Sequence, residues 1–130
     1  METGVATLVK QTVGVLVVDD ERTLRFTLRE SLAEEGYRVD TAADGAEALD
    51  KMERGDFTLV LLDQKLPDLN GLEVLKRIKA KRPDAQVVMM TAFGKFEDAV
   101  EAAKAGCFDY VGKPFELAKL TAAVTGTLVR

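Results

Sequence analysis

Short apolar runs alternate with longer segments of helical periodicity along this chain. Four of the runs end in polar residues: Val13–Val18 before Asp19 and Asp20, Thr58–Leu62 before Asp63, Val87–Met90 before Thr91, and Tyr110–Gly112 before Lys113. Short runs rich in Val and Leu between helical segments are typical of buried parallel strands. Because ligands bind beyond the carboxyl ends of such strands, the pattern predicts that three carboxylates, a hydroxyl and a lysine converge on one crevice.

The segments between and after these runs have the periodicity and end signals of helices. Gly36 and Gly106 are expected to close the first and fourth helices. Asp44 with Glu47, and Asn70 with Glu73, have capping-box spacing and predict the starts of the second and third. The apolar stripes expected to mark the helices are Leu24, Leu28 and Leu32; Leu72, Leu75 and Ile78; Phe96, Ala99, Val100 and Ala103; and Leu117, Leu120, Thr121, Val124 and Leu128.

The alternation of strands and helices predicts an α/β fold built from five βα units, with an edge strand at Tyr37–Ala42. Right-handed crossovers place helices on both faces of a parallel sheet, so a doubly wound arrangement is expected. The chain has 130 residues, 47% of them hydrophobic, which suffices for one domain with a full core. We expect residues 1–12 to form an N-terminal tail and residues 13–130 to form the domain.

Composition excludes several classes of function. The chain has no histidine, which excludes His-based zinc sites and Ser-His-Asp or Cys-His catalysis. The net charge of −4 and the sequence pI of about 4.9 argue against nucleic-acid binding within these residues. Cys107, the single cysteine, is interpreted as a small core residue. No apolar run approaches the ~18 residues of a membrane span, and no signal peptide is evident, so a cytoplasmic location is expected.

The predicted crevice contains more negative charge than one lysine can neutralise. Adjacent carboxylates raise one another's pKa unless cations offset them. A divalent metal is therefore expected, and Mg²⁺ suits a site of few carboxylates and waters. Taken separately, Asp19 and Asp20 could equally cap a helix, Thr91 could cap the fourth helix, and Lys113 could be a surface lysine.

Four segments together resemble the receiver domain of bacterial two-component response regulators. They are VVDD (17–20), LLDQKLPDLNGLEVL (61–75), MMTA (89–92) and DYVGKPF (109–115), each at a predicted strand end. The resemblance extends from about Val13 to Leu128. It implies a flavodoxin-like (βα)5 fold with a five-stranded parallel sheet in the order 2-1-3-4-5.

The resemblance also implies a role for each polar residue. Asp63 would be the phosphoacceptor, and Asp20, Asp63 and the backbone carbonyl of Lys65 would bind Mg²⁺, with Asp19 holding a water on the metal. Thr91 would donate its hydroxyl to the phosphoryl group and Lys113 would pair with a phosphoryl oxygen. The Lys113–Pro114 bond is expected to be cis. Thr91 and Tyr110 would act as switch residues, with Tyr110 turning inward when Thr91 moves.

The implied function is a phosphorylation-controlled signalling switch rather than an enzyme acting on a separate substrate. A sensor histidine kinase or a histidine phosphotransfer protein would supply the phosphoryl group. The face formed by the fourth helix, fifth strand and fifth helix would change shape and could mediate a homodimer. The segment Ala99–Leu117 resembles receivers of nitrogen-regulator-type enhancer-binding activators. That similarity implies control of transcription through an output domain outside these residues.

Three other interpretations stay open at this stage. The chain could be a stand-alone receiver or phosphorelay protein, or a pseudo-receiver scaffold, although pseudo-receivers usually lack an acidic residue or the lysine. Metal-dependent phosphatases with an Asp nucleophile resemble this site, but they have Asp-x-Asp where this chain has Asp63-Gln64-Lys65.

A long-lived phosphorylated form is also expected. Lys65 and Phe93 occupy the two positions that flank the approach of a hydrolytic water. Neither side chain offers a carboxylate or amide to orient that water.

Overall fold

The computed structural model describes residues 13–92 and 96–128; the predicted tail and Phe93 lie outside these ranges. Five strands form one sheet: β1 (Gly14–Val18), β2 (Arg38–Ala42), β3 (Leu59–Asp63), β4 (Gln86–Thr91) and β5 (Asp109–Gly112). All neighbouring strands pair in parallel, and their order is β2-β1-β3-β4-β5. The predicted fold class and strand order are confirmed.

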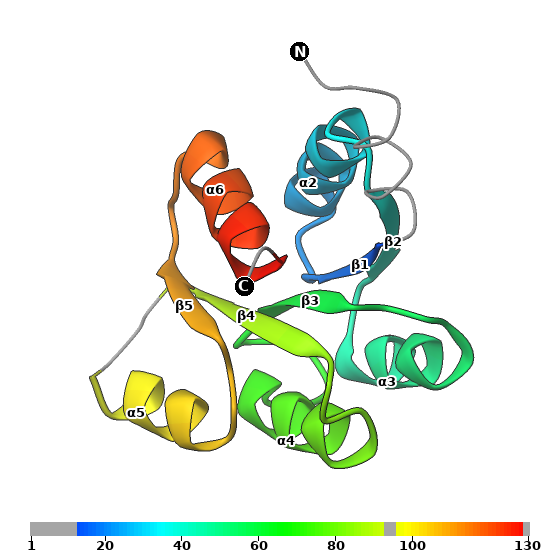
Figure 1. Ribbon diagram of the computed structural model, residues 1–130. Coiled ribbons are helices and arrows are strands. Elements are labelled where there is room, and N and C mark those ends of the chain that lie inside the picture. The colour runs from blue at the N-terminus through cyan, green and yellow to red at the C-terminus, as the bar shows by residue number, and fades with distance from the viewer. Residues whose placement is uncertain (1–12, 93–95, 129–130) are drawn as a thin grey trace.

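The helices of the described residues cover both faces of the sheet. They are α2 (Arg22–Glu34), α3 (Gly45–Arg54), α4 (Gly71–Lys81), α5 (Phe96–Lys104) and α6 (Leu117–Leu128). Helices α2 and α6 lie on one face, and α3, α4 and α5 lie on the other (Figure 1). Within the same ranges, none of these helices has both the length and the apolar character that a bilayer crossing demands.

The core consists of two apolar clusters, one on each face of the sheet. The side chains of the central strands β1 and β3 alternate between the clusters, so every residue of both strands is buried. Burial on both faces explains why these strands are continuous apolar runs in the sequence. Strand β2 lies at the edge, as predicted. Its residues alternate between exposed and partly buried from Arg38 to Thr41, but Ala42 at its end is buried, and so is Tyr37 just before it.

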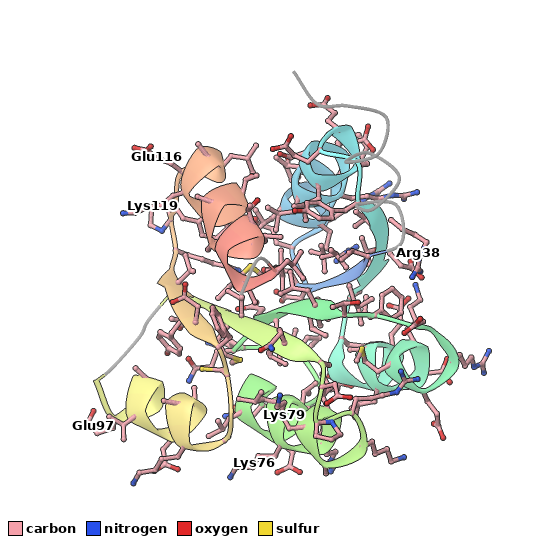
Figure 2. The ribbon with its side chains drawn as sticks, viewed as in Figure 1. Arg38, Lys76, Lys79, Glu97, Glu116 and Lys119 are labelled. Carbon is pink, nitrogen blue, oxygen red and sulfur yellow. The ribbon has the colours of Figure 1, made fainter. Side chains whose placement is uncertain are left out.

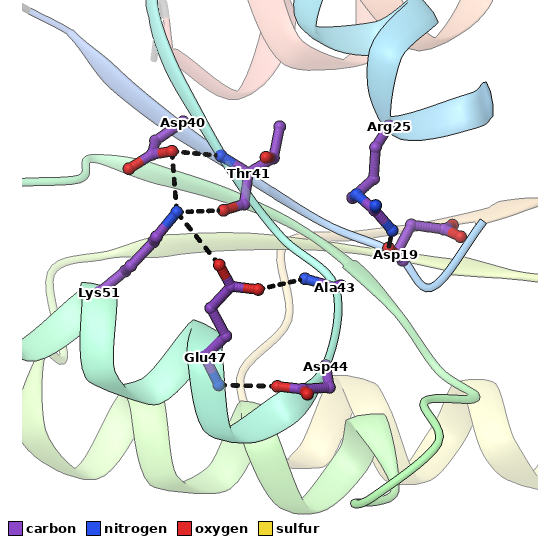
Figure 3. Close-up of polar contacts among 8 residues, drawn as sticks. All are labelled: Asp19, Arg25, Asp40, Thr41, Ala43, Asp44, Glu47 and Lys51. Atoms are coloured by element: carbon purple, nitrogen blue, oxygen red, sulfur yellow. Dashed lines mark hydrogen bonds and ion pairs between the residues drawn. The ribbon is translucent and has the colours of Figure 1, made fainter. Parts of the chain in front are cut away.

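The helix-end signals are largely confirmed. Gly36 and Gly106 have φ angles of 100° and 101°, which L side chains rarely adopt. At α3, Asp44 Oδ1 accepts from the Glu47 amide at 2.8 Å, and Glu47 Oε1 accepts from the Ala43 amide at 2.8 Å (Figure 3). Asn70 likewise accepts from the Leu72 amide at 2.8 Å.

Two of the predicted helical stripes need correction. Leu117 is 38% exposed because it lies in the first turn of α6, and the buried residues of that helix are Leu120, Val124 and Thr127. On α5, Ala103 is exposed and Ala102 is buried. One residue corresponds to about 100° of rotation on a helix, so a stripe misplaced by one position points away from the core.

Basic side chains cover the amino-terminal edge of the sheet. Arg38 Nη2 donates to the Asp56 carbonyl at 2.7 Å. Lys79 Nζ donates to the carbonyls of Pro83 and Ala85, each at 2.8 Å. Figure 2 labels both basic side chains. Cations thus satisfy loop carbonyls at this edge, whereas acidic side chains gather at the opposite edge.

Candidate functional site

A cavity of about 920 Å³ lies at the carboxyl edge of the sheet. Its lining includes all five polar side chains that the sequence predicts to converge: Asp19, Asp20, Asp63, Thr91 and Lys113. They come from the ends of β1, β3, β4 and β5, because parallel strands present their carboxyl ends at a common edge. The predicted convergence is therefore observed.

Three carboxylates form the acidic part of this cavity. Asp19, Asp20 and Asp63 each offer an oxygen, and these oxygens lie within 4.8 Å of one another. Asp19 and Asp63 are buried, whereas Asp20 is exposed. Carboxylate oxygens at this spacing repel one another and suit a hard divalent cation.

Lys113 supplies positive charge within the cavity. Its Nζ lies 2.5 Å from Asp19 Oδ2 and 3.5 Å from Asp63 Oδ2. Burial alone would lower the pKa of Lys113, but its hydrogen bond to Asp19 and the charges of Asp19 and Asp63 outweigh burial and raise it. The Lys113–Pro114 peptide bond is cis, as expected.

The electrostatics of Asp63 differ from those of an exposed carboxyl. Burial raises the pKa of Asp63, and the negative charge of Asp19 raises it further. Lys113 opposes the rise but does not cancel it. Asp63 is thus a partly desolvated carboxyl, and adding a cation to the cavity would favour its charged form.

Asp19 is held by contacts on both of its carboxyl oxygens. Oδ1 accepts from the Glu21 amide at 2.8 Å, and Oδ2 accepts from Lys113. Arg25 Nη1 donates to the Asp19 carbonyl at 2.8 Å (Figure 3). The N-cap of α2 is Glu21, which makes no side-chain cap bond. These contacts disfavour a role for Asp19 as a simple helix cap.

The loop after β3 is tightly folded against the end of that strand. The Gly71 amide donates to the Gln64 carbonyl at 2.7 Å, and a Cβ at Gly71 would lie 2.4 Å from the Asp63 carbonyl oxygen. Asp68 accepts from the Gly45 and Ala46 amides at 2.8 and 2.9 Å and so ties the loop to α3. Backbone amides lower the pKa of Asp68, chiefly that of Gly45.

Tyr110 and Gln64 meet beside this cavity. The Tyr110 hydroxyl donates to Gln64 Oε1 at 2.6 Å, and Tyr110 packs against the core cluster of the α3–α5 face. Thr91 is buried at the end of β4. Burial raises the pKa of Tyr110, and a hydrogen bond with Thr91 opposes that rise. Tyr110 therefore contacts both the residue after Asp63 and the cavity hydroxyl.

Sequence reasoning missed three side chains that organise the site. Gln64, Asp68 and Arg25 act through contacts between segments, which no local spacing reveals. Lys65, which the sequence places among the site residues, is exposed and lines the cavity; its amide lies 3.4 Å from Asp63 Oδ1. Cys107 is partly buried, and burial raises the pKa of its thiol, as suits a core residue rather than a nucleophile.

The family model of the response regulator receiver domain matches residues 15–125. The chain belongs to this family.

Known relatives agree with this assignment. Response regulator MprA of Mycobacterium sp. (strain KMS) is 40% identical over 118 residues, which cover 91% of this chain and 51% of the relative. Sporulation initiation phosphotransferase F of Bacillus subtilis (strain 168) is 37% identical over 110 residues, covering 85% and 89%. The chain thus spans about half the length of the first relative and most of the second.

Solved structures are similar over nearly the whole chain. A response regulator receiver domain protein (CheY-like) from Methanospirillum hungatei JF-1 has a TM-score of 0.86 and 33% identity, covering 88% of this chain and 91% of its own. NtrX from Brucella abortus has a TM-score of 0.82 and 36% identity, covering 88% of this chain and 26% of its own.

Proposed function

We propose that this receiver is a phosphorylation-controlled switch in which Asp63 accepts a phosphoryl group. The observation that carries the proposal is the meeting of three carboxylates, the Lys113 ammonium and the Thr91 hydroxyl in one cavity. The donor would be a phosphohistidine of a sensor histidine kinase or of a histidine phosphotransfer protein.

Mg²⁺ is the expected cofactor of this site. Its ligands would be Asp20, Asp63 and the backbone carbonyl of Lys65, while Asp19, which already accepts two hydrogen bonds, would contact the ion through water. The donor set fits, because oxygen ligands of this kind are those that Mg²⁺ prefers. When bound, the ion would offset the charge of the carboxylates and of the incoming phosphoryl group.

The proposed transfer forms one bond and breaks one bond. A carboxylate oxygen of Asp63 attacks phosphorus, and the bond from phosphorus to the donor imidazole nitrogen breaks, leaving its electron pair on that nitrogen. Lys113, 3.5 Å from Asp63, would pair with one phosphoryl oxygen. Thr91 would donate its hydroxyl to another. Catalysis of this kind consists of positioning and charge stabilisation, and the chain acts only on its own Asp63.

The output would be a changed affinity for a partner. New contacts from the phosphoryl group to Thr91 and Lys113 would alter the face formed by α5, β5 and α6, with Tyr110 as the aromatic residue of the relay. Charged residues such as Glu97 on α5 and Glu116 and Lys119 near the start of α6 lie on the outside of these helices (Figure 2). A homodimer through this face is one expected use of it.

The relatives indicate which process the phosphorylated receiver would control. The match covers about half of MprA and 44% of a relative named transcriptional regulatory protein TcrA, of Mycobacterium tuberculosis, which supports transcription control through a further domain. The assignment to the enhancer-binding class rests on the resemblance of the segment Ala99–Leu117. The second candidate is a phosphorelay protein without an output domain, and it is favoured by the 89% coverage of sporulation initiation phosphotransferase F. A pseudo-receiver is disfavoured, because the acidic cluster and the lysine are all present.

A small phosphorus–nitrogen donor tests the proposal. Phosphoramidate mimics phosphohistidine, and ³¹P NMR of the treated protein should show an acyl phosphate in wild type but not in Asp63→Asn. An equal signal in both proteins would refute the role of Asp63. Asp84→Asn, an exposed position in the turn before β4 at the opposite edge of the sheet, is the matched control and should still be phosphorylated.

A further inference from the structure

The hydrogen bond between Gln64 and Tyr110 joins the residue after the phosphoacceptor to the aromatic residue of the relay. Gln64 follows β3, and Tyr110 belongs to β5, so the contact extends across the intervening strand β4. Leu62, Met89 and Tyr110 all face the cluster on the α3–α5 face. Gln64 and Thr91, each two residues further along their strands, are expected to lie on the same side.

The backbone of Gln64 is held in place by hydrogen bonds to two neighbouring segments. Its amide donates to the Met90 carbonyl at 2.9 Å, and its carbonyl accepts from the Gly71 amide at 2.7 Å. The backbone of Gln64 is therefore tied to β4 on one side and to the start of α4 on the other. The backbone of Gln64 is thus already ordered, and only its side-chain rotamers have to be fixed when it forms a hydrogen bond.

The Tyr110 ring packs against the core, so its hydroxyl needs a hydrogen-bond partner there. The ring contacts the core cluster, and the hydroxyl lies 2.6 Å from Gln64 Oε1 while also interacting with Thr91. Leaving a partly buried hydroxyl without its acceptor costs free energy, so removing the Gln64 oxygen should favour exposure of the ring.

We infer that Gln64 is a positioning residue that anchors the Tyr110 hydroxyl beside Thr91 and so favours the inward position of the ring whether or not Asp63 is phosphorylated. This inference rests on the proposed function, because it assigns Gln64 to the relay. The Tyr110 ring would then occupy its inward position already in the unphosphorylated protein. Phosphorylation would move Thr91 while the ring stays where it is.

Fluorine NMR can test the inference, because the chain contains only two tyrosines, Tyr37 and Tyr110. Labelling with 3-fluorotyrosine gives two resonances, and Tyr110→Phe identifies the one from Tyr110. Line broadening by a soluble paramagnetic agent then measures how exposed each ring is.

Gln64→Met keeps the length of the side chain but removes the strong acceptor, whereas Gln64→Glu keeps an acceptor oxygen. In unphosphorylated protein we expect Gln64→Met to lower the ratio of inward to outward Tyr110 about fivefold, the equivalent of about 1 kcal/mol. Gln64→Glu should stay close to wild type. Gln86→Met, at the other end of the sheet, should change nothing.

Equal exposure of Tyr110 in wild type and Gln64→Met would overturn the inference, as would equal losses in Gln64→Met and Gln64→Glu. Modification of the same proteins by acetyl phosphate is followed separately by intact mass. If wild type is not modified, the proposed function fails, while the comparison of unmodified proteins still decides the role of Gln64.

Discussion

Lys113 lies closer to Asp19 than to Asp63: its Nζ is 2.5 Å from Asp19 Oδ2 and 3.5 Å from Asp63 Oδ2. The lysine therefore pairs mainly with the carboxylate that is not proposed to react. A phosphoryl group on Asp63 would compete with Asp19 for this cation. Lys113 is thus placed to respond to phosphorylation by changing partners.

Lys113→Ala should remain folded but lose the coupling between phosphorylation and Tyr110. The change removes a cation from a cluster of anions, so affinity for a divalent metal should not fall. The measurement is the NMR shift change near Tyr110 on adding beryllofluoride, which should shrink strongly in the variant. A response equal to that of wild type would argue against a relay through this lysine.

Asp63→Asn should stabilise the metal-free protein. The folded-state pKa of Asp63 is raised by burial and by Asp19, so the charged carboxylate costs stability at neutral pH. In wild type, stability should fall as pH rises from the ordinary carboxyl range through this raised pKa, and the amide variant should lack that fall.

We expect a gain of about 1 kcal/mol at pH 7, or roughly 2–8 °C in Tm. Thermal unfolding by circular dichroism in the presence of a chelator measures it. A lower Tm for Asp63→Asn across the whole pH range would show that burial and repulsion do not govern this carboxyl.

The two aspartates after β1 should differ in their effect on metal binding. Asp20 is exposed in the cavity, whereas both oxygens of Asp19 already accept hydrogen bonds. Asp20→Asn should therefore weaken Mn²⁺ binding more than Asp19→Asn does. NMR line broadening during a manganese titration reports both affinities, and equal values for the two variants and wild type would refute the assignment.

Gly71→Ala should destabilise the loop that carries the site. A Cβ there would lie 2.4 Å from the Asp63 carbonyl oxygen and 2.6 Å from the Gln64 Cα, both of which are backbone atoms. We expect a loss of about 1–3 kcal/mol in the free energy of unfolding. Gly126→Ala in α6 is the matched control, because its Cβ would meet nothing within 4 Å, and it should stabilise by about 0.5–1 kcal/mol. Equal urea midpoints for wild type and Gly71→Ala would show that the loop adapts.

Much of the fold could be predicted because its signals are local. The run Val13–Val18 is apolar throughout because β1 is buried on both faces, and glycines with positive φ close two helices. The convergence of Asp19, Asp63 and Lys113 follows from parallel strands alone, since their carboxyl ends share one edge.

The parts that could not be predicted depend on contacts between distant segments. Gln64 and Tyr110 are 46 residues apart. Asp68 accepts hydrogen bonds from the first two amides of α3, which lie 23 and 22 residues before it in the sequence. Sequence spacing also predicted that Leu117 and Ala103 are buried, and both are exposed. For Ala103, periodicity located the apolar stripe only to within one position. For Leu117, it did not show that the first turn of α6 extends beyond the core.

Asp63 is proposed to accept a phosphoryl group in a reaction that needs a divalent metal. The most direct measurement is intact mass after incubation with acetyl phosphate, with and without Mg²⁺, for wild type, Asp63→Asn and the Asp84→Asn control. We predict one phosphoryl adduct in wild type and in Asp84→Asn with Mg²⁺, and none in Asp63→Asn or after chelation. An adduct of unchanged yield in Asp63→Asn, or in wild type without metal, would contradict the account.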